Sequence, residues 1–170
     1  MSSIISKKTR AQKSYIIEEL HLYNILLDTR EIFIHGDQDD SEDPGTDFRM
    51  ATTFLKNIRL LENTGGDPII IHQYNIGGEW ESGMLIYDAI ATSTCHIIMI
   101  MHGIAGSMGS IIPQAADTRV VMPNCIFLIH DGYTGINPDL THKQSRSWTA
   151  MEEKARENMI DIYCDVCSTG

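Results

Sequence analysis

The fold is decided by residues 95–130, which read CHIIMIMHGIAGSMGSIIPQAADTRVVMPNCIFLIH. The apolar run from His96 to Met101 is too short for a confident helix and is typical of a buried strand. Small residues follow over 103–109 and predict a tight turn with Ser107 at its apex. A second apolar run, 126–129, ends in His130. We therefore expect a serine exposed at the end of one strand and a histidine at the end of a neighbouring one.

This pairing of Ser107 with His130 suggests nucleophilic catalysis. A strand that breaks at a serine and re-enters as a helix exposes the hydroxyl, and Ala105 and Gly109 would relieve crowding on either side, as in a nucleophile elbow. A serine hydroxyl also needs a base near neutral pH, and a histidine can supply it. The alternative is a buried serine in a glycine-rich turn beside a histidine that merely ends a strand.

Strands and helices alternate along the rest of the chain. We expect one helix to be capped by Thr46 and to end at Gly65-Gly66. A second helix should follow Ser107 and reach about Ala116, and Pro113 should kink or shorten it. Further helices are expected over residues 15–27, after Gly77-Gly78 and as one long helix near the C-terminus, and further strands over 31–35, 69–74, 120–121 and 126–129.

Three such alternations predict an α/β fold of right-handed β-α-β units with a mostly parallel sheet covered by helices. In sheets of this kind, ligands bind beyond the carboxyl ends of the strands. Both the Gly77-Gly78 turn and the Ser107 turn fall at such ends. Two adjacent turns of this kind supply backbone N–H groups to one spot, which suits an oxyanion hole.

The composition of the chain limits the classes of partner that we expect it to bind. The formal net charge of −10 argues against nucleic acid as a partner, and no apolar run is long enough to span a membrane. We expect residues 1–14 to form a mobile arm and 15–170 a single domain, in a cytoplasmic protein with reduced cysteines. Import into an organelle and the cytoplasm of a phage-infected host stay open as alternatives.

Two motifs resemble metal sites but fail the templates. Cys164 and Cys167 form a C-x-x-C without a second pair, so we expect two thiols on a helix and no zinc. The acidic loop 37–47 lacks the glycine and the final glutamate of a calcium loop. We therefore expect neither a metal nor a cofactor.

The whole pattern resembles the ClpP family of serine peptidases from about residue 15 to residue 170. Matching segments are G-x-A-x-S-M-G at 103–109, M-P-N at 122–124 with I-H at 129–130, the strand 30–36, Gly77-Gly78, and G-M-x-I-Y-D at 83–88. The resemblance implies the stacked β-α-β spiral that this family shares with the crotonases.

The resemblance also implies roles for particular residues. Ser107 would be the nucleophile and His130 the general base, and the N–H groups of Gly78 and Met108 would form the oxyanion hole. The reaction would be endopeptidase cleavage of unfolded polypeptides through an acyl-enzyme. It would take place inside stacked heptameric rings of identical subunits, joined through the stretch near 132–138 and the long helix after it and supplied by an ATP-driven unfoldase.

The chain departs from this family in ways that bear on activity. Asn75-Ile76 stands where the family has Ser-Pro, and the family's segment that carries the triad aspartate has no counterpart in the 170 residues. Asp117, Asp131 and Asp139 are available carboxylates that spacing does not distinguish. A catalytically impaired structural or regulatory subunit is therefore the alternative to an active peptidase, and a crotonase-like thioester enzyme is a third reading that the Ser-His pair opposes.

Overall fold

The computed structural model describes residues 10–37, 40, 42–132 and 141–168. A six-stranded sheet forms its centre, with strand order β1-β2-β3-β4-β5 and with β6 also paired to β4. Only the β1–β2 pair is antiparallel, and the other pairs are parallel. The strands are β1 (Ile25–Leu26), β2 (Glu31–Gly36), β3 (Ile69–Asn75), β4 (Ile97–Gly106), β5 (Thr118–Val121) and β6 (Ile126–Leu128). The expected α/β fold with a mostly parallel sheet is confirmed.

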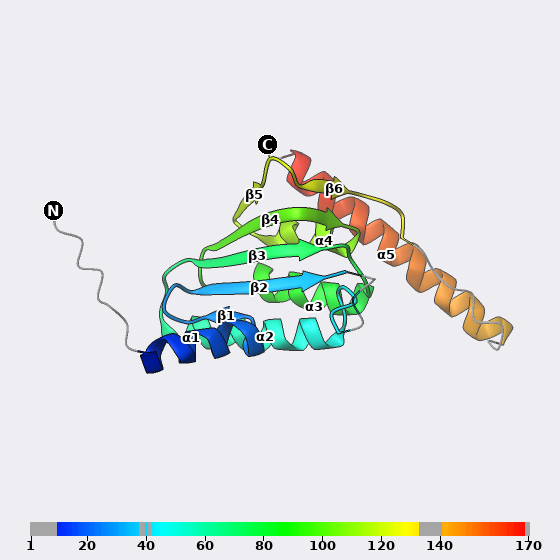
Figure 1. Ribbon diagram of the computed structural model, residues 1–170. Coiled ribbons are helices and arrows are strands. Elements are labelled where there is room, and N and C mark those ends of the chain that lie inside the picture. Colours follow the sequence, from blue (N-terminus) through cyan, green and yellow to red (C-terminus); the bar gives the residue numbers. More distant parts are fainter. Residues whose placement is uncertain (1–9, 38–39, 41, 133–140, 169–170) are drawn as a thin grey trace.

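Helices α2, α3 and α4 lie on one side of this sheet, α1 lies beside the β1 edge, and α5 extends beyond the body (Figure 1). The helices are α1 (Arg10–Tyr23), α2 (Phe48–Thr64), α3 (Trp80–Ala91), α4 (Met108–Ile111) and α5 (His142–Ser168), with a 3₁₀ turn over Ile112–Ala115. The change to a 3₁₀ turn at Ile112 agrees with the short helix expected from Pro113. No helix in the described part of the chain is long and apolar enough to cross a membrane.

The core lies between the sheet and these helices. Alternate residues of β3 and β4 are buried, because successive side chains of a strand point to opposite faces. Helix α2 contributes Phe54, Ile58 and Leu61, all at most 1% exposed. Their spacing of three and four residues is that of one helical face. The core thus fixes the sheet against α2 and α3.

Several expected boundaries were wrong. Helix α1 begins at Arg10 and ends at Tyr23, whereas we expected residues 15–27. Asn24 has a φ of 56°, a left-handed conformation that terminates helices, and the chain then turns into β1. We expected residues 1–14 to form a mobile arm. Residues 1–9 of this segment lie outside the described residues, and residues 10–14 belong to α1.

The cap of α2 and the end of β4 also differ from expectation. Asp47, not Thr46, caps α2, because its extended backbone (φ −128°) directs its carboxylate to the Met50 N–H at 2.8 Å. Strand β4 runs on to Gly106 instead of ending near Met101. Gly103, with a φ of 59°, allows the strand to pass through an irregularity and resume its pairing at Ala105.

Candidate active site

Three strand ends meet at the turn from Gly106 to Met108 around Ser107 (the serine turn). Gly106, the last residue of β4, lies opposite Leu128 of β6, and the Ser107 N–H donates to the Leu128 carbonyl at 3.0 Å. On the other side, Ala105 lies opposite Asn75 of β3. Because parallel strands end at the same edge of the sheet, this register brings together the segments that follow β3, β4 and β6.

Ser107 itself is held in a strained backbone conformation, with φ 51° and ψ −124°. A positive φ is uncommon for residues other than glycine and costs of order 1–3 kcal/mol. Here it turns the chain abruptly from β4 into α4, and the Ser110 N–H and hydroxyl both donate to the Ser107 carbonyl, at 2.8 and 2.6 Å. The partly exposed serine at this turn is the geometry expected of a nucleophile elbow.

The Gly77-Gly78 turn contacts the serine turn directly. A Cβ added to Gly77 would lie 2.4 Å from the Ser107 Cβ, so only glycine permits this approach. Gly78 is exposed, and neither its N–H nor that of Met108 donates a hydrogen bond to another residue that the structure describes. Met108 is the first residue of α4, where helical N–H groups have no partner within the helix. Two N–H groups at adjacent turns are thus left for a ligand oxygen.

All four predicted site residues line one cavity of about 560 Å³, namely Gly78, Ser107, Met108 and His130. Its far wall is formed by α5, which contributes Trp148, Met151 and Ala155 among others. Charged groups around its rim include Glu79, Glu81, Asp131, Glu152, Lys154 and Arg156. The predicted residues therefore face a common space.

The imidazole of His130 is held by its own loop. The Gly132 N–H donates to the His130 Nδ1 at 3.2 Å, so Nδ1 is the acceptor and a neutral ring carries its proton on Nε2. In a Ser-His-Asp triad the Nδ1–H instead donates to the acid. No hydrogen bond joins Ser107 to His130 among the residues described. The geometry brings the two residues to one cavity without linking them.

The carboxylates that spacing could not distinguish are now separated. Asp117 accepts from the Ile97 N–H at 2.7 Å, at the start of β4 and thus at the opposite edge of the sheet from Ser107. Asp131 lines the cavity, but its carboxylate lies 3.4 Å from Arg156 of α5. Asp139 and most of the turn-rich stretch 132–138 lie outside the described residues.

Helix α5 is fixed to the serine turn at its C-terminal half. The Tyr163 hydroxyl lies 2.6 Å from the Ser110 hydroxyl, and burial raises the pKa of Tyr163 even though this hydrogen bond opposes the shift. Met159 is buried, whereas Trp148 and Met151, which lie nearer the N-terminal end of the helix, are 48% and 56% exposed. Of these three apolar side chains, the one at the C-terminal half is therefore the one that is packed.

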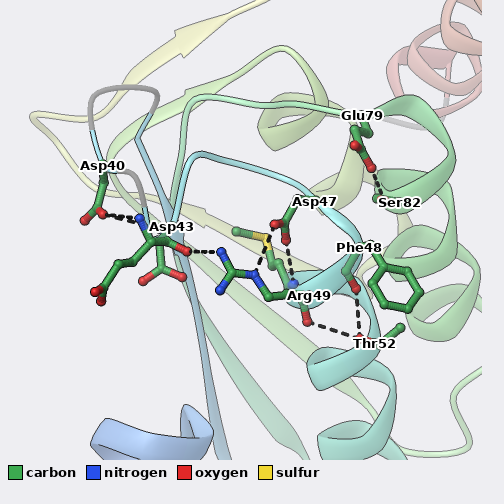
Figure 2. A network of polar contacts seen from close by, with 10 residues as sticks. Asp40, Asp43, Asp47, Phe48, Arg49, Thr52, Glu79 and Ser82 are labelled. Atoms are coloured by element: carbon green, nitrogen blue, oxygen red, sulfur yellow. Dashed lines mark hydrogen bonds and ion pairs between the residues drawn. The ribbon is translucent and has the colours of Figure 1, made fainter.

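The described residues of the two motifs that resembled metal sites have other surroundings. Cys164 and Cys167 are exposed free thiols on α5. Within the described ranges, no three His, Cys, Asp or Glu side chains are grouped so that they could hold a metal ion. The described residues of the acidic loop hydrogen-bond to one another and to α2. Its Asp40 carboxylate accepts from the N–H groups of Glu42 and Asp43, which lowers the pKa of Asp40 (Figure 2).

The fold and this site define a class of α/β proteins that present a serine at a strained strand-to-helix turn, beside backbone N–H donors and a histidine. Comparison with known proteins identifies the family. The chain belongs to the Clp protease family, whose model matches residues 12–169.

Named relatives agree with this assignment. The chain is 35% identical over 117 residues to "ATP-dependent Clp protease proteolytic subunit 2" of Pseudomonas aeruginosa, a match that covers 68% of this chain but only 54% of that protein. It is 29% identical to the proteolytic subunit of Deinococcus radiodurans, covering 94% of this chain and 72% of the relative. The solved structure of the ClpP1 N165D mutant from Listeria monocytogenes superposes with a TM-score of 0.68 at 25% identity, over 82% of this chain and 73% of that one. The chain thus resembles a proteolytic subunit over only part of the relatives' length.

Sequence reasoning missed two residues that contact the site's framework, Thr46 and Asn75. Thr46 forms a parallel bridge to Gly78, and the side chain of Asn75 hydrogen-bonds to Thr46 and to Gly77. A hint of this role was the Asn75-Ile76 pair that replaces the family's Ser-Pro before Gly77. The partner of Asn75, 29 residues away in the chain, gave no signal of its own.

Proposed function

We propose that this chain is a serine endopeptidase subunit that hydrolyses peptide bonds of unfolded polypeptides inside an oligomeric chamber. The observation that carries the proposal is the convergence of Ser107, His130 and the N–H groups of Gly78 and Met108 on one cavity. Membership of the Clp protease family supports it, because the relatives are named as proteolytic subunits of an ATP-dependent protease.

The proposed chemistry is acyl transfer in two halves. The Ser107 Oγ attacks the peptide carbonyl while His130 takes the hydroxyl proton, and the N–H groups of Gly78 and Met108 stabilise the oxyanion. Collapse of this intermediate breaks the C–N bond, and His130 returns the proton to the leaving amine. Water then attacks the acyl-enzyme with His130 as base, which releases the second product and restores Ser107.

A second candidate function, an impaired structural or regulatory subunit, is favoured by the state of His130. A general base needs a free lone pair on the nitrogen that faces the serine. With the Gly132 N–H donating to Nδ1, the ring proton lies on Nε2. Catalysis through Nε2 therefore requires the proton to move to Nδ1 and the bond from Gly132 to break. A wrong tautomer costs a typical triad about 10⁴-fold in turnover.

The assembly belongs to the proposal as well. We expect copies of this chain to form heptameric rings, stacked in pairs, that receive unfolded polypeptide from an ATP-driven unfoldase. The relatives' name, an ATP-dependent protease, supports such a partner. Exposed apolar residues on β6, such as Ile126 at 63%, support contact with further subunits.

Labelling with a fluorophosphonate probe tests the activity. The Ser107 Oγ displaces fluoride from phosphorus as the base takes its proton, so the labelling rate reports how far the hydroxyl is activated. We expect rapid labelling of the wild type, none in Ser107→Ala, and a loss of about 10²-fold or more in His130→Ala. The control is Ser147→Ala, whose hydroxyl, within the described ranges, bonds only to the Lys143 carbonyl of its own helix.

Three results separate the candidates. Labelling that disappears with Ser107 and slows with His130 establishes the peptidase chemistry. Labelling that is slow in the wild type and unchanged in His130→Ala favours the impaired subunit. Labelling that persists in Ser107→Ala refutes the assignment of the nucleophile.

A further inference from the structure

The Gly77-Gly78 turn is held from outside by a single residue of the loop before α2. The Thr46 N–H donates to the Gly77 carbonyl at 2.7 Å, and the Thr46 carbonyl accepts from the Glu79 N–H at 2.8 Å. These two bonds fix the peptide groups on either side of Gly78. They leave the Gly78 N–H outside the bridge, without a partner among the described residues. Thr46 therefore sets the direction in which this N–H points.

A buried pair of side chains, Asn75 and Thr46, also stabilises the Gly77-Gly78 turn. The Asn75 Nδ2 donates to the Thr46 Oγ1 at 2.8 Å, and the Asn75 Oδ1 accepts from the Gly77 N–H at 2.9 Å. Asn75 is 0% exposed and Thr46 is 1% exposed. Burying polar groups is unfavourable unless they are hydrogen-bonded, so their bonds direct both residues into one geometry.

Asn75 also contacts the serine turn. A Cβ added to Gly109 would lie 2.3 Å from the Asn75 carbonyl oxygen and 3.1 Å from the Asn75 Cβ. Gly109 follows Met108, the second N–H donor of the site. One residue at the end of β3 thus packs against both turns that carry the donors.

Thr46 is itself anchored by its surroundings. The next residue, Asp47, caps α2, and Arg49 reaches back to the Glu42 carbonyl at 2.7 Å and to the Asp47 carboxylate at 3.7 Å (Figure 2). The Glu79–Ser82 hydrogen bond at 2.8 Å fixes the start of α3 just after the turn. The bridge from Thr46 to Gly78 therefore joins two rigid helix starts.

We infer that Thr46 and Asn75 are positioning residues that hold the Gly78 N–H in the direction an oxyanion requires. This inference rests on the proposed function, because it concerns the same reaction. Neither residue touches the reacting atoms; the Thr46 hydroxyl acts through Asn75, and Asn75 acts through Gly77. Removing the hydroxyl frees the Asn75 amide to turn, and the N–H of Gly78 then departs from its direction.

The test compares Thr46→Val, which keeps the shape and removes the hydroxyl, with Thr46→Ser, which keeps the hydroxyl. Steady-state hydrolysis of a short fluorogenic peptide and fluorophosphonate labelling are both measured. We expect kcat of Thr46→Val to fall about 10- to 100-fold with KM within about twofold, because loss of one oxyanion donor costs about 10²–10³-fold in kcat and misalignment costs less. Thr46→Ser should restore most of kcat.

Thr92→Val is the matched control, since among the residues that the structure describes its hydroxyl bonds only to the Asp88 carbonyl at the end of α3. A Thr46→Val variant with wild-type kcat overturns this inference while the proposed function stands. Equal losses in Thr46→Val and Thr46→Ser, or a loss confined to KM or to the midpoint of unfolding, also overturn it by indicating a structural role. A wild type that neither reacts with the probe nor cleaves the peptide overturns the proposed function and this inference together.

Discussion

At the scale of single residues, Arg30 supports the fold from an unusual conformation. Its φ of 58° is in the left-handed region, which is unfavourable for a residue with a long side chain. Its guanidinium donates to the carbonyls of Leu61, Gly65 and Asp67 at 3.0–3.1 Å and to the Thr64 hydroxyl at 3.1 Å. These acceptors include carbonyls at the C-terminal end of α2, which lack partners within the helix. The hydrogen bonds of the guanidinium thus offset the cost of the positive φ at Arg30.

Replacing this residue should destabilise the whole domain. We expect Arg30→Ala to lower the free energy of unfolding by about 2 kcal/mol, because the half-buried bond to the Leu61 carbonyl and the exposed bonds to the Gly65 and Asp67 carbonyls lose their charged donor. Arg30→Lys should recover only part of this, since an ammonium cannot reproduce the planar fork. Urea denaturation measures both. Lys56→Ala, an exposed position on α2, is the control, and an Arg30→Ala loss no larger than that of the control would contradict the assignment.

At the scale of elements, Glu62 links the last turn of α2 to the connection between α3 and β4. Its carboxylate pairs with Arg59 at 2.7 Å and accepts from the Thr94 N–H at 3.3 Å. Burial by itself raises the pKa of Glu62, but hydrogen bonds from Ser93, Arg59 and Thr94 outweigh it and hold the pKa below its ordinary value of 4.5. The carboxylate is therefore more stable in the folded chain than in the unfolded one.

This lowered pKa makes the link dependent on pH. A carboxyl group whose pKa is lower in the folded state contributes its full stabilisation above the unfolded pKa and loses it as the pH falls through the folded value. We expect Glu62→Gln to cost about 1–2 kcal/mol near pH 7 and progressively less below about pH 4.5. Urea denaturation of both chains across this range measures the difference, and a difference that does not change with pH would refute the ionic contribution.

At the scale of the whole molecule, periodicity and turn residues predicted the order of strands and helices and the place of the serine turn. Each of these depends on residues close together in the chain, such as the run 96–101 and the small residues after it. The predicted residues Ser107 and His130 line the same cavity because β4 and β6 are adjacent parallel strands.

What could not be predicted depends on contacts between distant segments. Thr46 and Asp47 are both good capping residues, but the Thr46 hydroxyl bonds to the distant Asn75 and the Asp47 carboxylate caps α2. Likewise, β1 has two residues and is defined by its pairing to β2, not by any periodicity of its own. The tautomer of His130 depends on the N–H of Gly132, which no spacing rule describes.

The last prediction concerns the surface that β5, β6 and the connection between them expose. Apolar side chains gather there without cover from the described part of the chain: Val120, Val121, Met122, Ile126, Phe127, Leu128 and Ile129 are all 39–63% exposed. Contiguous apolar surface of this kind marks an interaction site. Because the proposed function requires a ring, we expect a second copy of the chain to cover it.

Ile126→Glu should then shift sedimentation-velocity profiles towards the monomer, because the introduced charge would be desolvated in the contact. Leu22→Glu, on the exposed face of α1 at 68%, is the matched control. An oligomer unchanged by Ile126→Glu, or weakened equally by both variants, would exclude this surface as the contact.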